Sequence, residues 1–144
     1  MVSGGPDAAD IARGTTRLLA ALDFVCLSEF PLANGRRADL FALGRDGRCA
    51  IVEIKTSPAD FRADRKWREY LPHADRFYFA VSPGFPLGLL PEEEGLILAD
   101  RFEAAVLRQA IERPLAPARR RTLTLRFARL AAARLARRDD PPLA

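Results

Sequence analysis

The sequence predicts a mixed α/β fold, in which helices pack on a sheet of antiparallel and parallel strands. Three apolar, strand-like runs follow one another through turn signals, which is typical of an antiparallel meander. A capped helical segment then separates the third run from an aromatic fourth run, and such a crossover favours parallel pairing. At 144 residues, 49% of them hydrophobic, the chain can form one domain with a real core.

The first four elements are a helix and the meander. Residues 6–23 are expected to be helical, because Pro6 suits an opening turn and apolar residues recur at helical spacing. Residues 24–30, 38–43 and 48–55 are the three expected strands. Asn-Gly and Asp-Gly pairs lie between these strands and mark tight turns.

A crossover helix and two further strands should follow. Ser57 is a good N-cap for a helix over residues 58–71. Residues 77–81 and 95–99 are apolar and rich in β-prone side chains, so each is expected to be a strand. The segment 82–94 between them has three prolines and three consecutive glutamates, which predicts a solvated loop.

The C-terminal part is predicted to be helical. Residues 101–113 have a helical pattern, and residues 119–138 form a second, basic helix with apolar side chains at helical spacing. We therefore expect a main domain over residues 1–113 and a basic helical extension over residues 114–144 that packs on the same domain.

Positive charge is concentrated in this extension. The net charge is +4, but residues 1–112 carry 14 basic and 17 acidic groups, whereas residues 113–144 carry nine Arg and two Asp. A basic helix of this kind could contact phosphates, and we assign Arg119, Arg120 and Arg121 to that role. A solvated helix face is the alternative. A membrane-surface role is weaker, because the apolar positions are largely alanine.

Other classes of protein are disfavoured by composition. No apolar stretch has the length of a membrane span, and Met1 to Asp10 lack a signal-peptide core, so a cytoplasmic protein is expected. Cys26 and Cys49 lie in apolar runs without flanking histidines, which predicts buried thiols rather than a zinc site. His73 is the only histidine, and we interpret it as structural.

Two ionisable side chains in the third expected strand indicate a functional site. Glu53 and Lys55 interrupt an apolar run, and residues two apart on a strand share a face. The hairpin places Asp39 near Glu53. Two carboxylates with a neighbouring lysine suit Mg²⁺ or Mn²⁺ and the activation of water. Only two of the 23 basic residues are lysines, so the choice of lysine at position 55 indicates a specific role for its ammonium group. The alternative is an ion pair at the sheet rim.

The spacing of these residues resembles that of the PD-(D/E)XK nuclease superfamily, in which an acid is followed by Glu-x-Lys at the end of the third strand and then by a helix. A more specific resemblance, over roughly residues 11–100, is to the MmcB-type DNA repair proteins of bacteria. It is carried by Gly35–Asp39, Val52–Lys55, Asp60-Phe61, Lys66–Leu71 and Phe77–Val81. This resemblance implies a restriction-endonuclease-like αβββαβ core with an extra basic C-terminal helix.

The chain departs from the superfamily pattern at two places. Ala38 stands where the superfamily name has proline. A glutamate that several members place in the first helix is also missing, since only Asp7 and Asp10 lie there. Glu29 on the first strand could substitute as a further acidic group or pair with Arg37.

The resemblance implies a metal-dependent DNA endonuclease of DNA repair, with branched, damaged or single-stranded DNA as its substrate. Asp39 and Glu53 would bind one or two Mg²⁺ or Mn²⁺ ions, with the Ile54 backbone carbonyl as a third ligand. Lys55 would orient the nucleophile or offset developing charge. The rival interpretation is a non-catalytic module that binds DNA or a repair-protein partner, and an RNA-directed enzyme is a weaker third.

Further basic residues near this site are expected to contact nucleic acid. Arg36 and Arg37 lie three and two residues before Asp39. Arg62 and Lys66 lie on the helix that follows Lys55, where they could reach backbone phosphates. Trp67 and Tyr70 on the same helix could stack on an unpaired base, but their spacing favours a place in the core.

Overall fold

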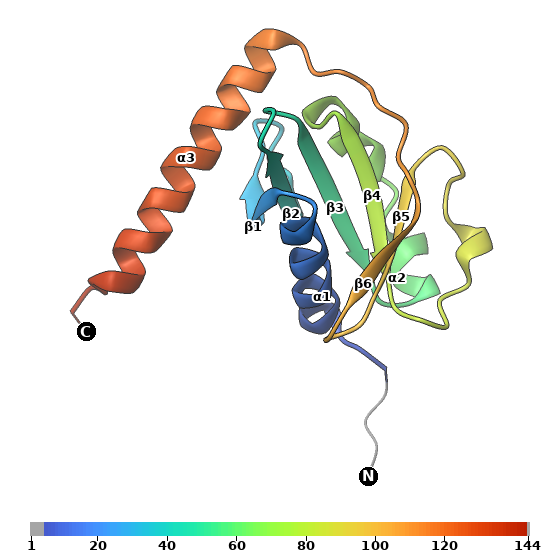
Figure 1. The fold of residues 1–144 in the computed structure, drawn as a ribbon. Coiled ribbons are helices and arrows are strands. Elements are labelled where there is room, and N and C mark those ends of the chain that lie inside the picture. The colour runs from blue at the N-terminus through green and yellow to red at the C-terminus, as the bar shows by residue number, and fades with distance from the viewer. Residues whose placement is uncertain (1–4, 144) are drawn as a thin grey trace.

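A computed structural model describes residues 5–143 of the chain. Six strands form one mixed sheet in the order β1-β2-β3-β4-β5-β6 (Figure 1). β1 to β3 are an antiparallel meander, β3, β4 and β5 are parallel, and β6 returns antiparallel to β5. The elements are α1 (Ala8–Ala21), β1 (Phe24–Pro31), β2 (Arg37–Gly44), β3 (Cys49–Lys55), α2 (Pro58–Ala63), the 3₁₀ helix η1 (Trp67–His73), β4 (Arg76–Val81), the 3₁₀ helix η2 (Leu87–Leu89), β5 (Gly95–Ala99), β6 (Ala104–Arg108) and α3 (Pro117–Asp139).

The predicted fold class is confirmed. α1, the three meander strands, α2 and β4 follow in the expected αβββαβ order, and helices cover both faces of the sheet. α1 packs on one face, over a core that includes Leu40, Val52 and Ile97. The other face carries α2, η1 and α3 over an aromatic core that includes Phe41 and Phe77.

Alternation along β3 places its polar residues on one face. Ala50, Val52 and Ile54 belong to the core beneath α1, whereas Cys49 and Ile51 belong to the core on the opposite face. Glu53 and Lys55 share the parity of Ile51, so they face the side of α2 and η1. All seven residues of β3 are buried, which fits a central strand with helices on both sides.

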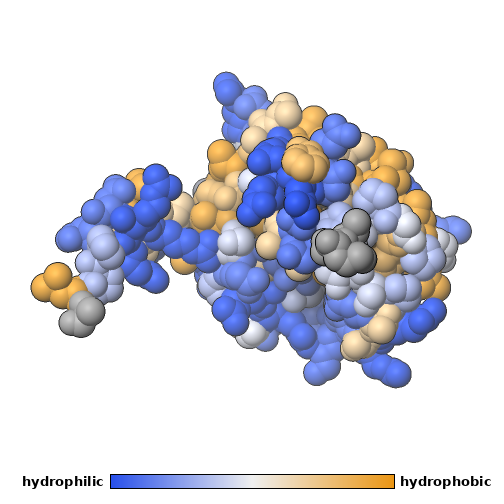
Figure 2. All heavy atoms as spheres, turned by 90° about the horizontal axis from the view of Figure 1, so that it is seen from below, coloured by the Kyte–Doolittle hydropathy of each residue, from blue (hydrophilic) through white to orange (hydrophobic). Residues whose placement is uncertain are grey.

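α3 is attached to this domain through its first half. Its Leu123 and Phe127 are buried in the core that also contains Phe30 and Phe41, and Phe127 lies 6.2 Å from the ring centroid of each. Every residue after Arg134 on this helix is exposed. The C-terminal part of α3 therefore leaves the body of the molecule as an arm (Figure 1), whose surface is mainly hydrophilic (Figure 2).

Residues 101–113 are not helical, contrary to the pattern-based prediction. The Asp100 carboxylate accepts hydrogen bonds from the N–H groups of Phe102 and Glu103, which forms a turn at the end of β5. The chain then runs back beside β5 as β6. Pairing with the exposed edge of β5 thus prevails over the helical spacing of the apolar residues.

The helix predicted over residues 58–71 is divided. α2 ends at Ala63, because Asp64 adopts an extended backbone conformation and accepts the N–H of Lys66 with its own side chain. The chain resumes as η1. The segment 82–94 is also less solvated than predicted, since Glu94 is buried and forms two 3.0 Å hydrogen bonds with the guanidinium of Arg113.

Within the described part of the chain, no helix combines the length and the apolar character that crossing a bilayer requires.

Candidate active site

Asp39 and Glu53 lie side by side where the pairing of β2 with β3 ends. The last paired residues are Leu40 and Val52, so Asp39 and Glu53 are next in register. The backbone N–H of Asp39 donates to Glu53 Oε2 at 2.8 Å, and the N–H of Ile54 donates to Asp39 Oδ2 at 2.8 Å. Each carboxylate therefore uses one oxygen to hold the strands together. Within residues 5–143, the other oxygen of each has no hydrogen-bond partner.

Burial and mutual repulsion disfavour charge on both carboxylates. Glu53 is 4% exposed. The pKa of Glu53 is raised to about 8, mainly because burial removes solvation and secondarily because the negative charge of Asp39 is near. Burial also raises the pKa of Asp39, and the negative charges of Glu29 and Asp60 add to this effect. A site that disfavours two adjacent negative charges gains most from a bound cation, so the donor oxygens suit a hard divalent ion.

Lys55 is held by a residue that sequence reasoning missed. Its ammonium lies 2.8 Å from Asp64 Oδ2, and its side chain is only 7% exposed. The carboxylate of Asp60 accepts the backbone N–H of Thr56, just after β3. Acidic side chains are common after a capped helix start, so no sequence signal singles out Asp64 as the partner of Lys55.

Glu29 borders the site in an unusual backbone conformation. It lies between Ser28 and Phe30, whose partners on β2 are Leu40 and Ala38, and its φ of 49° is in the left-handed region. A non-glycine residue in this region is strained, by roughly 1–3 kcal/mol. The Glu29 carboxylate lies 3.8 Å from the guanidinium of Arg37, and both side chains are exposed. Glu29 therefore pairs with Arg37, which was one of its two expected roles.

The oxygen donors that converge at this site are few. Within residues 5–143, no three His, Cys, Asp or Glu side chains form a group that could hold a metal ion. Two carboxylates and the Ile54 carbonyl are thus the predicted ligand set. Water and a substrate oxygen would have to complete the shell of Mg²⁺ or Mn²⁺.

Three predicted DNA contacts gather next to Asp39. Arg36, Arg37 and Lys66 line a polar surface pocket of about 520 Å³ together with Asn34, Gly35, Glu69 and Tyr70. Arg36 is partly neutralised by Glu69, whose carboxylate lies 3.2 Å from its Nε. Arg62 lies on α2 and does not line this pocket. Three cationic side chains line this pocket, so it suits an anion such as a phosphate.

Trp67 and Tyr70 are core residues, as their spacing favoured. Trp67 is 5% exposed and stacks on Phe77 with ring centroids 5.7 Å apart. Tyr70 is 7% exposed, and its hydroxyl donates to the carbonyl of Arg37. Both rings are committed to packing. Tyr70 also fixes the strand that precedes Asp39.

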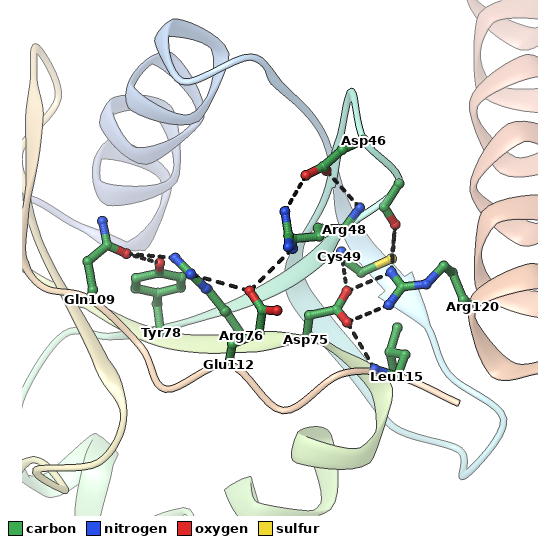
Figure 3. Close-up of polar contacts among 11 residues, drawn as sticks. Asp46, Arg48, Cys49, Asp75, Arg76, Tyr78, Gln109, Glu112, Leu115 and Arg120 are labelled. Atoms are coloured by element: carbon green, nitrogen blue, oxygen red, sulfur yellow. Dashed lines mark hydrogen bonds and ion pairs between the residues drawn. The ribbon is translucent and has the colours of Figure 1, made fainter. Parts of the chain in front are cut away.

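Arg120, one of the residues assigned to nucleic acid, has a structural role in the fold. Its guanidinium donates to both oxygens of Asp75, at 2.8 and 2.6 Å, and to the carbonyl of Gly47 (Figure 3). Asp75 is 2% exposed and also accepts the N–H groups of Cys49 and Leu115. This network anchors the start of α3 to the β2–β3 hairpin. Arg119 donates to the carbonyl of Pro72 but is exposed, and Arg121 is exposed.

Comparisons with known proteins agree with this architecture. Residues 4–142 match the model of a family described as DNA repair protein MmcB-like. A solved structure of a protein of unknown function from Silicibacter pomeroyi is 47% identical, with a TM-score of 0.89 over 91% of this chain and 90% of that one. A repair endonuclease from Pyrococcus abyssi is 17% identical, with a TM-score of 0.45 over 72% of this chain and 50% of that one. No curated protein matches the chain. Because the family model covers nearly the whole sequence, the chain belongs to the MmcB-like DNA repair protein family.

Proposed function

We propose that this protein is a metal-dependent DNA endonuclease that acts in DNA repair. One observation carries the proposal. Glu53 is buried and its neighbour Asp39 is half-buried, both have raised pKa values, and each has an oxygen without a hydrogen-bond partner in residues 5–143. Such an arrangement costs stability, which is typical of functional rather than structural carboxylates.

Each residue of the site has a chemical task in this proposal. Asp39 and Glu53, with the Ile54 carbonyl, would hold Mg²⁺ or Mn²⁺. When bound, the ion supplies a water of lowered pKa and neutralises charge on the scissile phosphate. Lys55, kept in place by Asp64, orients the attacking water or offsets the charge that develops on phosphorus. Arg36, Arg37 and Lys66 bind flanking phosphates and so fix the substrate strand.

The test is a cleavage assay with a matched pair of variants. Single-stranded, branched and damaged DNA, and an RNA strand, are incubated with the full chain and Mg²⁺ or Mn²⁺. Glu53→Gln preserves the shape of the side chain and its hydrogen bond with Asp39, and should lower nicking by about 100-fold or more. Glu103→Gln changes an exposed acid away from the site and should leave nicking unchanged. Equal nicking by wild type and Glu53→Gln would refute the proposal.

A non-catalytic module is the second candidate. It is supported by the small set of convergent acids and by the capture of Lys55 by Asp64. This alternative predicts DNA or partner binding that survives Glu53→Gln, without turnover on any substrate of the panel. Cleavage of the RNA strand alone would favour an RNA-directed enzyme.

A further inference from the structure

The arm formed by the C-terminal part of α3 carries positive charge that the fold does not neutralise. Between Arg113 and Asp139 the sequence has no acidic residue. Within residues 5–143, Arg120 is the only arginine of α3 that forms an ion pair. The others that remain without a carboxylate partner in this part of the chain are Arg119, Arg121, Arg126, Arg129, Arg134, Arg137 and Arg138.

This charge continues from the candidate active site. Arg134 donates to the carbonyl of Glu29 and Arg126 to the carbonyl of Pro31, at the end of β1 that borders Asp39. A surface groove of about 480 Å³ lies between this end of β1 and α3, and Arg126 and Arg129 are among its lining residues. The arginines of α3 therefore start at the strand end that borders Asp39, so a polyanion at the site would lie next to this helix.

The composition of the arm also indicates a charged ligand. Like charges three or four residues apart on a helix repel, and Arg134 has this relation to both Arg137 and Arg138. No residue after Arg134 on the helix is buried, so packing does not offset this repulsion. Leu135 is exposed among alanines and arginines, and the exposed Leu125 lines the groove with Leu130 and Pro31, so the apolar surface on the outer part of the helix is small. A polyanionic backbone would relieve the repulsion.

We propose that α3 is a DNA-binding arm, which contacts the phosphate backbone of duplex flanking the bond at the Asp39–Glu53 site. The inference rests on the proposed function only in taking DNA as the polyanion. Beyond Phe127 the helix extends by roughly 18 Å at about 1.5 Å per residue. This length corresponds to about five base pairs. The arm thus lengthens the footprint and contributes affinity rather than chemistry.

The test compares two triple variants of the full chain that lose the same net charge. Arg129→Gln/Arg137→Gln/Arg138→Gln removes exposed charge from α3, and Arg13→Gln/Arg45→Gln/Arg101→Gln removes exposed charge elsewhere. Binding to labelled 12- and 30-base-pair duplexes is measured in EDTA over a salt series, so that cleavage cannot interfere. For the α3 variant, the magnitude of the slope of log K against log salt concentration should be smaller by roughly 2–3. Each lost phosphate contact contributes about 0.9 to this slope. The control should keep the wild-type slope, and lysines at the same three positions of α3 should restore most affinity.

Several results would overturn the inference. Unchanged low-salt affinity of the α3 variant would remove the arm from DNA binding, and an equal loss in the control would indicate net charge alone. Binding to anionic phospholipid vesicles but not to duplex would identify a membrane-surface helix. A wild-type dimer in light scattering that the α3 variant loses would identify a self-association surface. A failed cleavage assay leaves this binding test intact, because no metal is present in it.

Discussion

The ammonium of Lys55 and the carboxylate of Asp64 form a nearly buried ion pair, with Nζ 2.8 Å from Oδ2. The pair connects the end of β3 to the residue that terminates α2. A buried lysine without a partner would be costly, so Asp64 both stabilises the charge and limits the positions that the ammonium can take. Lys55 is thereby held beside Glu53 and Asp39.

Asp64→Asn should destabilise the protein, because a neutral amide compensates the buried ammonium poorly. We expect the free energy of unfolding to fall by roughly 1–3 kcal/mol. Urea denaturation at pH 7 measures this change. Asp46→Asn is the matched control, since Asp46 pairs with Arg48 at the surface, where solvent screens the interaction and the loss should be small. Equal losses in the two variants would show that Asp64 has no special role.

The site could be predicted from the sequence only in part, for a physical reason. Glu53 and Lys55 stand out because an apolar strand seldom carries charge, and Asp39 follows from the geometry of the hairpin. Asp64 is different. Asp64 contacts Lys55 from the position directly after α2, which ends at Ala63. Helical propensity alone predicts that this helix continues to residue 71. Asp64 ends the helix through its extended backbone and its local bond to the N–H of Lys66, and its ion pair with Lys55 adds a tertiary contact that local pattern does not reveal.

The same limitation explains the errors outside the site. Residues 101–113 have a helical pattern, but residues 104–108 within them pair with the edge of β5 as β6. Arg119, Arg120 and Arg121 are equivalent in sequence, and only the position of Asp75 on the folded sheet selects Arg120. Local pattern therefore predicted the order of the central elements, whereas long-range pairing decided which charges are free.

Arg120→Gln and Arg121→Gln should differ strongly in their effect on stability. Arg120 compensates Asp75, whose pKa is lowered despite its burial because Arg120 and backbone N–H groups bind the carboxylate. Loss of this guanidinium leaves a buried charge, so the free energy of unfolding should fall by about 3–5 kcal/mol. Arg121→Gln should change it by less than about 0.5 kcal/mol. Thermal unfolding of both variants at pH 7 gives the comparison, and comparable midpoints would contradict the structural role of Arg120.

Gly14→Ala should be destabilising although alanine favours helices. An added Cβ at Gly14 would lie 2.1 Å from the carbonyl oxygen of Asp100, so α1 would have to move away from the turn before β6. Overpacking of this kind costs about 1–3 kcal/mol. Gly88→Ala is the control, because an added Cβ there has no atom within 4 Å. Chemical denaturation of the two variants tests the prediction, and a Gly14→Ala variant as stable as wild type would disprove the close contact.

The raised pKa of Glu53 predicts a pH-dependent stability difference. The folded protein retains a proton up to pH about 8, whereas the unfolded chain releases it near the ordinary value of 4.5. The free energy of unfolding of the wild type should therefore fall as pH rises from about 4.5 to 8. Glu53→Gln lacks this titration. Without metal, its stability relative to wild type should increase with pH, by up to about 4 kcal/mol at pH 8.

Urea denaturation at pH 5 and pH 8 in EDTA measures this difference. Glu103→Gln is an exposed control, and the difference between its free energy of unfolding and that of the wild type should not depend on pH. A pH-independent offset for Glu53→Gln would show that Glu53 is ionised throughout and that the site tolerates both charges. Mg²⁺ should narrow the difference between the two proteins at pH 8, because the ion stabilises the ionised carboxylates of the wild type and finds only one in the variant. A midpoint that Mg²⁺ shifts equally in wild type and variant would place the ion elsewhere.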